Sequence, residues 1–163
     1  MKKSQIFSIC TIALGALGLI FVLFLAGITM KTSVAMLGSD TESYAGLKTI
    51  FGEKNGFDFS IFLFIAFLAV LAALVFAVLP LFGIKKKFFP IIAIACFAVA
   101  GIFFFMTKQF VNVDGDYFFD WGKYTGSVPG ASFSVNLGVG AILGGICFIG
   151  AAVTSALPLV IKD

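Results

Sequence analysis

The sequence predicts an all-α integral membrane protein built as a bundle of four transmembrane helices. Hydrophobic residues make up 61% of the 163 residues, charged residues only 12%, and the mean hydropathy is +1.14. Soluble domains average roughly 45–50% apolar and about 25% charged residues, so this composition excludes a water-soluble domain. Four apolar runs without a charged residue each reach the about 20 residues that a membrane-spanning helix needs. The runs are 6–30, 59–84, 88–107 and 133–161.

The first run is expected to be a retained span. A cleaved signal peptide is the alternative, since Met1-Lys2-Lys3 precedes the run and Ser33-Val34-Ala35 resembles a cleavage site. However, the apolar part of a signal peptide usually covers only about 7–15 residues. All four runs should be helical, because a lipid-exposed backbone must satisfy its own hydrogen bonds and the alternation of barrel strands is missing. We therefore expect one membrane domain, 1–163.

The lysines predict which side of the membrane each segment occupies. Cytoplasmic segments next to membrane spans are enriched in Lys and Arg. The two ends of the chain and the turn at 85–87 carry lysine and almost no acid, whereas the loops at 31–58 and 107–134 carry slightly more acids than lysines. We therefore expect cytoplasmic termini and two extracytoplasmic loops. Every basic residue is lysine. This usage fits an AT-rich coding sequence and therefore favours a bacterial cell membrane.

The two halves of the chain, 1–84 and 85–163, are predicted to be tandem helical hairpins. A Gly-x3-Gly-x2-Phe-Ser-(Ile/Val) pattern begins at Gly52 and again at Gly126, and Leu-Pro-Leu occurs late in both the second and the fourth runs. Patterns that recur in the same order indicate a duplication. Because each half has two spans, the halves share one orientation, which predicts a pseudo-twofold axis along the membrane normal. The alternative is that Gly, Phe and Leu are simply abundant here.

Small residues lie along two faces of the fourth run. Close approach of two helices needs such residues, and a GxxxG pair is a frequent case. One face could pack inside the bundle, and two such faces would leave room for a partner helix or a second copy. The first face, which contains the GxxxG pair, holds Gly140, Gly144, Cys147, Ala151 and Ser155. The second face holds Gly138, Ala141, Gly145, Ala152 and Ala156.

The first outer loop is expected to contain a short amphipathic helix. Ser39-Asp40-Thr41-Glu42 fits a capping box, and Gly52 is suited to ending a helix. The predicted helix would lie on the bundle or the outer leaflet, or dock an extracellular partner. Its apolar face would consist of Tyr44, Leu47 and Phe51. The second loop adds the aromatic residues Trp121 and Tyr124, either as further docking residues or at the level of the headgroups.

The second outer loop contains a partial calcium-loop pattern. Four oxygen-bearing residues stand at positions 1, 3, 5 and 9 of an EF-hand numbering. Position 6 is Tyr117 where glycine is needed, and position 12 is Lys123 where a bidentate glutamate is needed. A solvated acidic loop is therefore the alternative to a metal site. The candidate ligands are Asn112, Asp114, Asp116 and Asp120.

The residues that most enzymes need are scarce. Histidine is absent, and Cys10, Cys96 and Cys147 all lie inside apolar runs, which disfavours zinc sites, disulfide frameworks and His-assisted catalysis. No run contains Asp, Glu, Lys, Arg or His, although such residues mark proton and ion pathways. We expect no enzyme activity, no cofactor and no nucleic-acid partner.

The layout of four spans, cytoplasmic termini and a longer first outer loop resembles that of claudins. The claudin loop signature combines a Trp with two disulfide-bonded cysteines, and the loop at 31–58 contains neither residue type. The resemblance therefore covers the layout alone, and it assigns no role to any residue.

The sequence favours a non-enzymatic, multi-pass protein of the cytoplasmic membrane that serves as a scaffold or accessory subunit of a membrane complex. It would contact membrane lipids and would assemble with itself or with another integral membrane protein through the fourth run and the outer loops. The alternative is a small-solute or ion channel or transporter formed by an oligomer. Few polar residues are available to line such a path.

Overall fold

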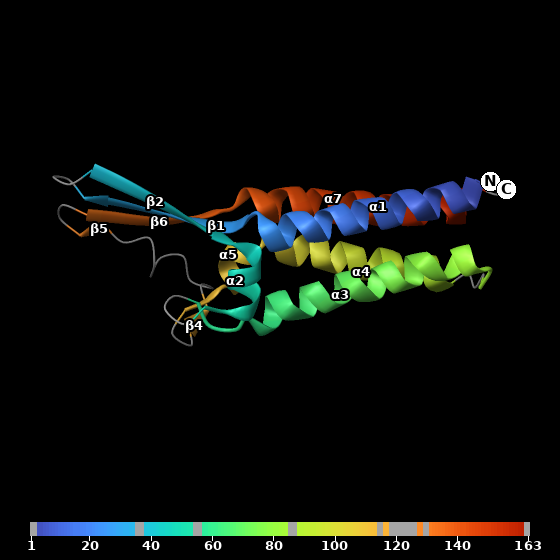
Figure 1. Cartoon of the computed structure of the whole chain (residues 1–163), viewed down its shortest axis with the longest axis horizontal. Coiled ribbons are helices and arrows are strands. Elements are labelled where there is room, and N and C mark those ends of the chain that lie inside the picture. The colour runs from blue at the N-terminus through green and yellow to red at the C-terminus, as the bar shows by residue number, and fades with distance from the viewer. Residues whose placement is uncertain are drawn as a thin grey trace.

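A computed structural model describes residues 3–34, 38–53, 57–84, 88–113, 116–117, 127–128 and 131–161. Four long helices dominate these residues (Figure 1). They are α1 (Lys3–Phe24), α3 (Ile61–Val78, continued by the 3-10 helix η1, Leu79–Phe82), α4 (Phe88–Phe105) and α7 (Val139–Val160). By length and composition, each can cross a membrane, so the chain has the character of a multi-pass membrane protein.

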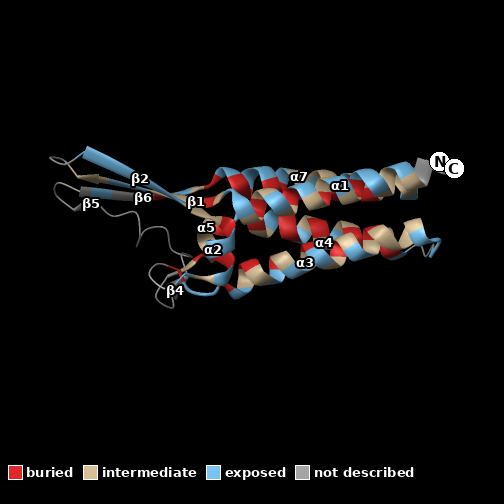
Figure 2. Ribbon diagram, in the orientation of Figure 1, coloured by how far each residue is buried: buried red, intermediate tan, exposed pale blue. Residues whose placement is uncertain are grey.

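The four helices pack side by side. Helix α1 packs against α7, α7 against α4 and α4 against α3, and a smaller contact between α3 and α1 completes the ring. Both ends of the chain lie at the same end of the bundle as the end of α3 and the start of α4 (Figure 1). Exposed residues cover the outer faces of the helices and buried residues lie between them (Figure 2). The exposed residues include many large apolar side chains, as a lipid-facing surface requires.

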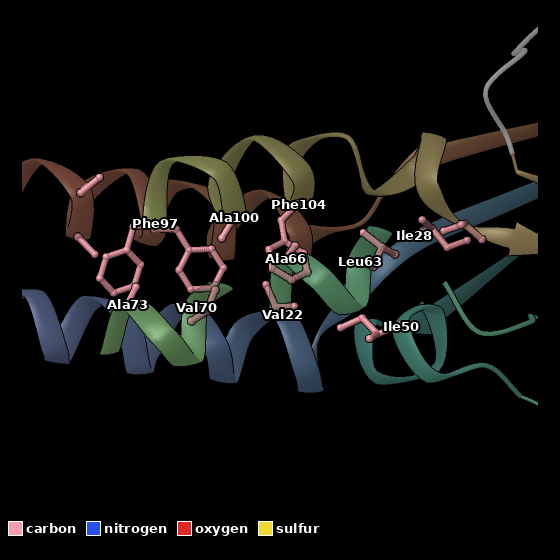
Figure 3. Close-up of a cluster of buried hydrophobic side chains, with 14 of the residues drawn as sticks. Val22, Ile28, Ile50, Leu63, Ala66, Val70, Ala73, Phe97, Ala100 and Phe104 are labelled. Carbon is pink, nitrogen blue, oxygen red and sulfur yellow. The ribbon is translucent and has the colours of Figure 1, made fainter. Parts of the chain in front are cut away.

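Aromatic and small side chains fill the interior of the bundle. Phe97 and Phe104 of α4 and Phe148 of α7 are almost completely buried, and the rings of Phe104 and Phe148 lie 5.5 Å apart. Figure 3 shows Val70 of α3 and Phe97 of α4 pointing into this interior. Ala66 and Ala73 of α3 are fully buried as well, so alanine lets α3 approach the phenylalanine-bearing helices closely.

Two of the apolar runs do not stay helical along their whole length. Helix α1 ends at Phe24 and the chain continues as strand β1 (Ala26–Val34), whereas strand β6 (Ala131–Leu137) precedes α7. The predicted spans 6–30 and 133–161 are therefore too long at their outer ends. Gly27 and β-branched residues such as Ile28 disfavour a helix and favour a strand when a partner strand is available.

Strands from both loops form one antiparallel sheet in the order β2-β1-β6-β5. β2 (Gly38–Ala45) forms a hairpin with β1, β6 pairs with the other side of β1, and the two-residue β5 (Ser127–Val128) adds to β6. Figure 1 shows the sheet continuing away from the bundle in the direction of α1 and α7. The all-α prediction is therefore wrong outside the bundle.

The helix predicted in the first outer loop is half right. The capping-box residues 39–42 belong to strand β2, and only the six residues of α2 (Gly46–Phe51) are helical. Pairing with β1 is the physical reason, since Thr41 lies opposite Lys31 and Glu42 opposite Met30. Ser, Asp and Thr have low helix propensity, so a partner strand decides the conformation of this segment. Gly52 ends α2 with a positive φ of 85°, as predicted for the stop.

Candidate functional site

The small residues of α7 are packed against helices of the same chain. A Cβ atom added to Gly140 would lie 2.6 Å from the carbonyl oxygen of Phe21, and one added to Gly144 would lie 2.2 Å from Val22 Cγ2. Both neighbours belong to α1. The GxxxG pair therefore allows α1 and α7 to approach each other, and α1 occupies this surface within the bundle.

The rest of this stripe also faces α1, and the second small face of α7 turns to α4. Ala151 is fully buried, Ser155 is 7% exposed, and the Cβ of Cys147 lies near Gly18 of α1. A Cβ on Gly145 would lie 2.9 Å from the ring of Phe105 in α4. Gly140, Gly144, Cys147 and Ser155 are thus in contact with α1, and Gly145 is in contact with α4. The exposed side of α7 carries large apolar residues such as Ile146 and Val153.

A cluster of hydroxyl groups joins α1 to α7 near the end of the bundle that holds the chain termini. Thr11 Oγ1 lies 2.8 Å from Thr154 Oγ1 and 3.5 Å from Ser155 Oγ. Thr11 also donates to the carbonyl oxygen of Phe7 at 3.0 Å. Because each of these hydroxyls bonds another hydroxyl or the backbone, the side chains can be buried without losing their hydrogen bonds.

A small cavity lies beside this cluster. Its volume is about 20 Å³, and prolines from three helices, Pro80, Pro90 and Pro158, line it together with Ser8 and Thr11. This volume has room for about one water molecule.

The residues predicted to dock a partner differ in their exposure and in their contacts within the chain. Leu47 is 47% exposed and Phe51 is 44% exposed, and both lie on α2 at the end of the bundle opposite the termini. The Phe51 ring nevertheless packs edge-on against Phe64 of α3, with ring centres 5.9 Å apart. Tyr44 packs against Phe57 at 4.8 Å. Trp121 and Tyr124 lie outside the described residues.

The phenol of Tyr44 is tied to a neighbouring acid on the same strand. Its hydroxyl donates a hydrogen bond to Glu42. This bond stabilises the neutral phenol, and burial and the negative charge of Glu42 act in the same direction, so the pKa of Tyr44 is raised above its usual value. The contact is a local one on the outer sheet.

Hydrogen bonds connect the end of the first outer loop, at residues 58–60, to the start of the second, at residues 110–112. The backbone N–H of Asp58 donates to the carbonyl oxygen of Asn112 at 2.9 Å, and Asn112 Nδ2 donates to the carbonyl oxygen of Phe59 at 3.3 Å. Ser60, which caps α3, donates through Oγ to the carbonyl oxygen of Phe110 at 2.5 Å. Phe110 is the last residue of the short helix α5 (Thr107–Phe110).

The predicted metal site falls largely on residues that the structure does not describe. Asn112 begins strand β3 (Asn112–Val113), and Asp116 begins strand β4 (Asp116–Tyr117), which pairs with it. Asp114 and Asp120 lie outside the described residues, so the calcium site stays a prediction. Within the described ranges, no three His, Cys, Asp or Glu side chains are grouped as metal ligands.

The outer sheet has two chemically different faces. In an antiparallel sheet, directly paired residues point to the same face, and the register therefore defines three rows across β2, β1 and β6. We call the face formed by these rows the polar sheet face. Its rows are Ser43–Thr29–Asn136, Thr41–Lys31–Ser134 and Ser39–Ser33–Ser132.

The opposite face holds the apolar residues at the base of the sheet and the acids farther out. Ile28 lies opposite Tyr44, and Ile28 belongs to the same buried core as Ile50 of α2. Glu42 pairs with Met30 and Asp40 pairs with Thr32, so both acids of β2 share this second face. Sequence reasoning missed the polar sheet face, although the alternation Thr29, Lys31, Ser33 within an expected span and loop was its signal.

Comparison with known proteins gives no match for the chain. No protein-family model, curated protein or solved structure matches it.

Proposed function

We propose that this chain is a non-enzymatic, multi-pass membrane protein that acts as a scaffold or accessory subunit of a membrane complex. The observation that carries the proposal is the short, hydrogen-bonded connection between the sheet and two helices. One residue, Leu25, separates α1 from β1, and one residue, Gly138, separates β6 from α7. Gly138 N–H also donates to the carbonyl oxygen of Gly27 at 2.9 Å. A sheet fixed in this way is suited to presenting a surface outside the bundle.

The distribution of polar groups supports a role without catalysis. In the described part of the chain, the ion pair is Lys48–Glu53 at 2.8 Å, and both side chains are about half exposed. The buried hydroxyls of the bundle bond one another or the backbone. An activated nucleophile needs an adjacent base and an orienting group, and the described residues offer no such set.

We propose the cytoplasmic membrane of a bacterium as the location, with both termini in the cytoplasm and the sheet outside. Lysines near the chain termini and in the turn at 85–87 support this orientation. The two halves, 1–84 and 85–163, are proposed to be hairpins related by a pseudo-twofold axis along the membrane normal. Pro80 and Pro158, which occupy equivalent Leu-Pro-Leu sequences, line the same cavity, and this proximity supports an axis that passes near the cavity.

The partner is proposed to be another integral membrane protein or a second copy, bound at the outer end of the bundle. Helix α2 exposes Leu47 and Phe51 there, beside the lipid-facing side of α3. Because α1 and α4 cover the small-residue faces of α7, α2 is the better candidate for the contact. Burying the exposed halves of these two side chains supplies on the order of 1.5–3 kcal/mol.

Gentle extraction of the tagged protein from its native membrane tests the proposal, with mass spectrometry of what remains bound. We expect a defined partner or oligomer that is lost in the Leu47→Ala, Phe51→Ala variant. The matched control is Leu17→Ala, Ile20→Ala, which truncates two equally exposed apolar residues on the lipid-facing side of α1. Recovery of the monomer alone from wild type would contradict the proposal. A homo-oligomer without another protein that conducts solutes in liposomes would favour a channel.

A further inference from the structure

We infer that the polar sheet face binds an anionic glycan, with Lys31 at its centre contacting the acidic group. This site goes beyond the proposed scaffold role, because it assigns a ligand to a surface that the contact through α2 does not use. It rests on the register of the sheet, on the exposure of the face and on the separation of charges between its two faces.

The polar sheet face is a regular array of hydrogen-bonding groups. Seven of the nine residues in its three rows are serine or threonine, and the other two are Lys31 and Asn136. Each of them is exposed or half-buried. Neighbouring rows are roughly 6.7 Å apart along a strand, and neighbouring strands are about 4.8 Å apart. Hydroxyl groups both donate and accept hydrogen bonds, so the array can pair with the hydroxyls of a sugar chain lying across it.

Lys31 gives this face its charge. It lies in the middle row between Thr41 and Ser134, and it is exposed. The acids of β2, Asp40 and Glu42, are on the opposite face. Among the described residues Lys31 forms no ion pair, so its ammonium group is available to a ligand. An ammonium flanked by hydroxyls favours a carboxylate, sulfate or phosphate, because charge-assisted hydrogen bonds are the stronger kind.

The position of Lys31 argues against a lipid headgroup as the ligand. Lys31 lies five residues beyond Ala26, the first residue of β1, which corresponds to roughly 16 Å at about 3.3 Å per residue. The headgroup layer extends only about 5–8 Å from the hydrocarbon core on each side. The sheet continues in the direction of α1 and α7 (Figure 1). Taking the start of β1 as the edge of the hydrocarbon core, this places the middle row beyond the headgroups.

The composition of the face argues against a protein partner. Protein interfaces are enriched in aromatic residues, Met and Arg and depleted in Ser and Lys, and hot-spot residues are rarely Ser or Thr. The polar sheet face has the reverse composition. A polymer whose own surface consists of hydroxyls, with acidic groups at intervals, fits both the array and Lys31.

The test measures binding of defined polymers to the full chain in nanodiscs. The probes are polygalacturonate as the acidic glycan, dextran as a neutral glycan and polyglutamate as a polyanion without sugar hydroxyls. We expect polygalacturonate to bind best. Lys31→Gln should weaken its binding by about tenfold or more, the effect of losing one charge-assisted hydrogen bond. Thr41→Val, Ser134→Val should weaken it as well, while valine keeps the preference for a strand.

The matched control is Thr32→Val, which changes the adjacent residue of β1 on the opposite face. This variant should bind polygalacturonate like wild type. Absence of polygalacturonate binding, or binding that is unchanged in Lys31→Gln, would overturn the inference. Equal binding of polyglutamate would also overturn it, because charge alone would then be the cause. Loss of the partner in the Leu47→Ala, Phe51→Ala variant with normal glycan binding would separate this site from the scaffold role.

Discussion

Replacing Gly140 by alanine should destabilise the bundle through the contact between α7 and α1. The added Cβ would lie 2.6 Å from the carbonyl oxygen of Phe21, whereas ordinary contact begins at 3.4 Å. The two helices must therefore separate by roughly 0.8 Å along this contact, and the obstacle is backbone, which no rotamer change can relieve. Overpacking of this kind costs about 1–3 kcal/mol.

Gly150, on the same helix, provides the matched control. A Cβ at this position would meet Leu14 Cδ1 at 3.5 Å, which is an ordinary contact. Alanine gains about 1 kcal/mol of helix propensity at Gly150, in the interior of α7, and less at Gly140, the second residue of α7. The difference in stability between the two variants therefore contains this smaller gain as well as the packing cost.

Unfolding by increasing SDS mole fraction, followed by far-UV circular dichroism in detergent, measures this difference. We expect Gly140→Ala to be less stable than Gly150→Ala by about 1–3 kcal/mol. The loss should appear in the monomer, because α1 of the same chain supplies the contact. Equal stability of the two variants, or a loss confined to an oligomer, would refute the packing that we describe for α7.

Three further predictions concern polar contacts. Thr11→Val should destabilise the α1–α7 pair by about 0.6 kcal/mol, typical of an interhelical hydrogen bond in a membrane, and a double-mutant cycle with Thr154→Val would return no coupling if the bond were absent. Ser60→Ala should cost about 1–2 kcal/mol and speed hydrogen exchange at the start of α3; unchanged exchange there would contradict the capping role. Glu42→Gln should lower the pKa of Tyr44 towards 10.0, measured as the phenolate absorbance that Tyr44→Phe removes. Because the folded-state pKa is raised, the stabilising effect of the Tyr44–Glu42 contact is present below pH 10.0 and disappears as the pH rises through the pKa of Tyr44 in the folded protein.

The membrane helices could be predicted from sequence because hydrophobicity over about 20 residues is a local property. The bounds of α3 and α4 lie within a few residues of the predicted runs. Helix α3 also begins at a serine cap, Ser60, and η1 at its end contains a proline. The outer ends of the first and fourth runs do not follow it. Ile28, Met30 and Val135 are as apolar as membrane residues, yet they lie in strands.

The sheet could not be predicted from one sequence, because its decisive pairing joins distant segments. Ile28 lies opposite Leu137 and Lys31 opposite Ser134, and nothing in the local sequence of either strand names the other. The capping-box pattern at 39–42 illustrates the same limit, since its local preference for a helix start is overcome by the partner strand. The polar sheet face depends on this pairing, so it too escaped prediction.

Because the connections between helices and strands are short, a tilt of α1 and α7 in the membrane moves the tip of the outer sheet. Nine residues of β1 extend from the end of α1, a reach of roughly 30 Å, so each degree of tilt in the α1–α7 pair displaces the tip by about 0.5 Å. Transmembrane helices change tilt to match the thickness of the bilayer around them. The thickness of the host membrane would thus set the angle at which the sheet stands above it, and the tip would convert a change of lipid composition into a displacement of several ångströms.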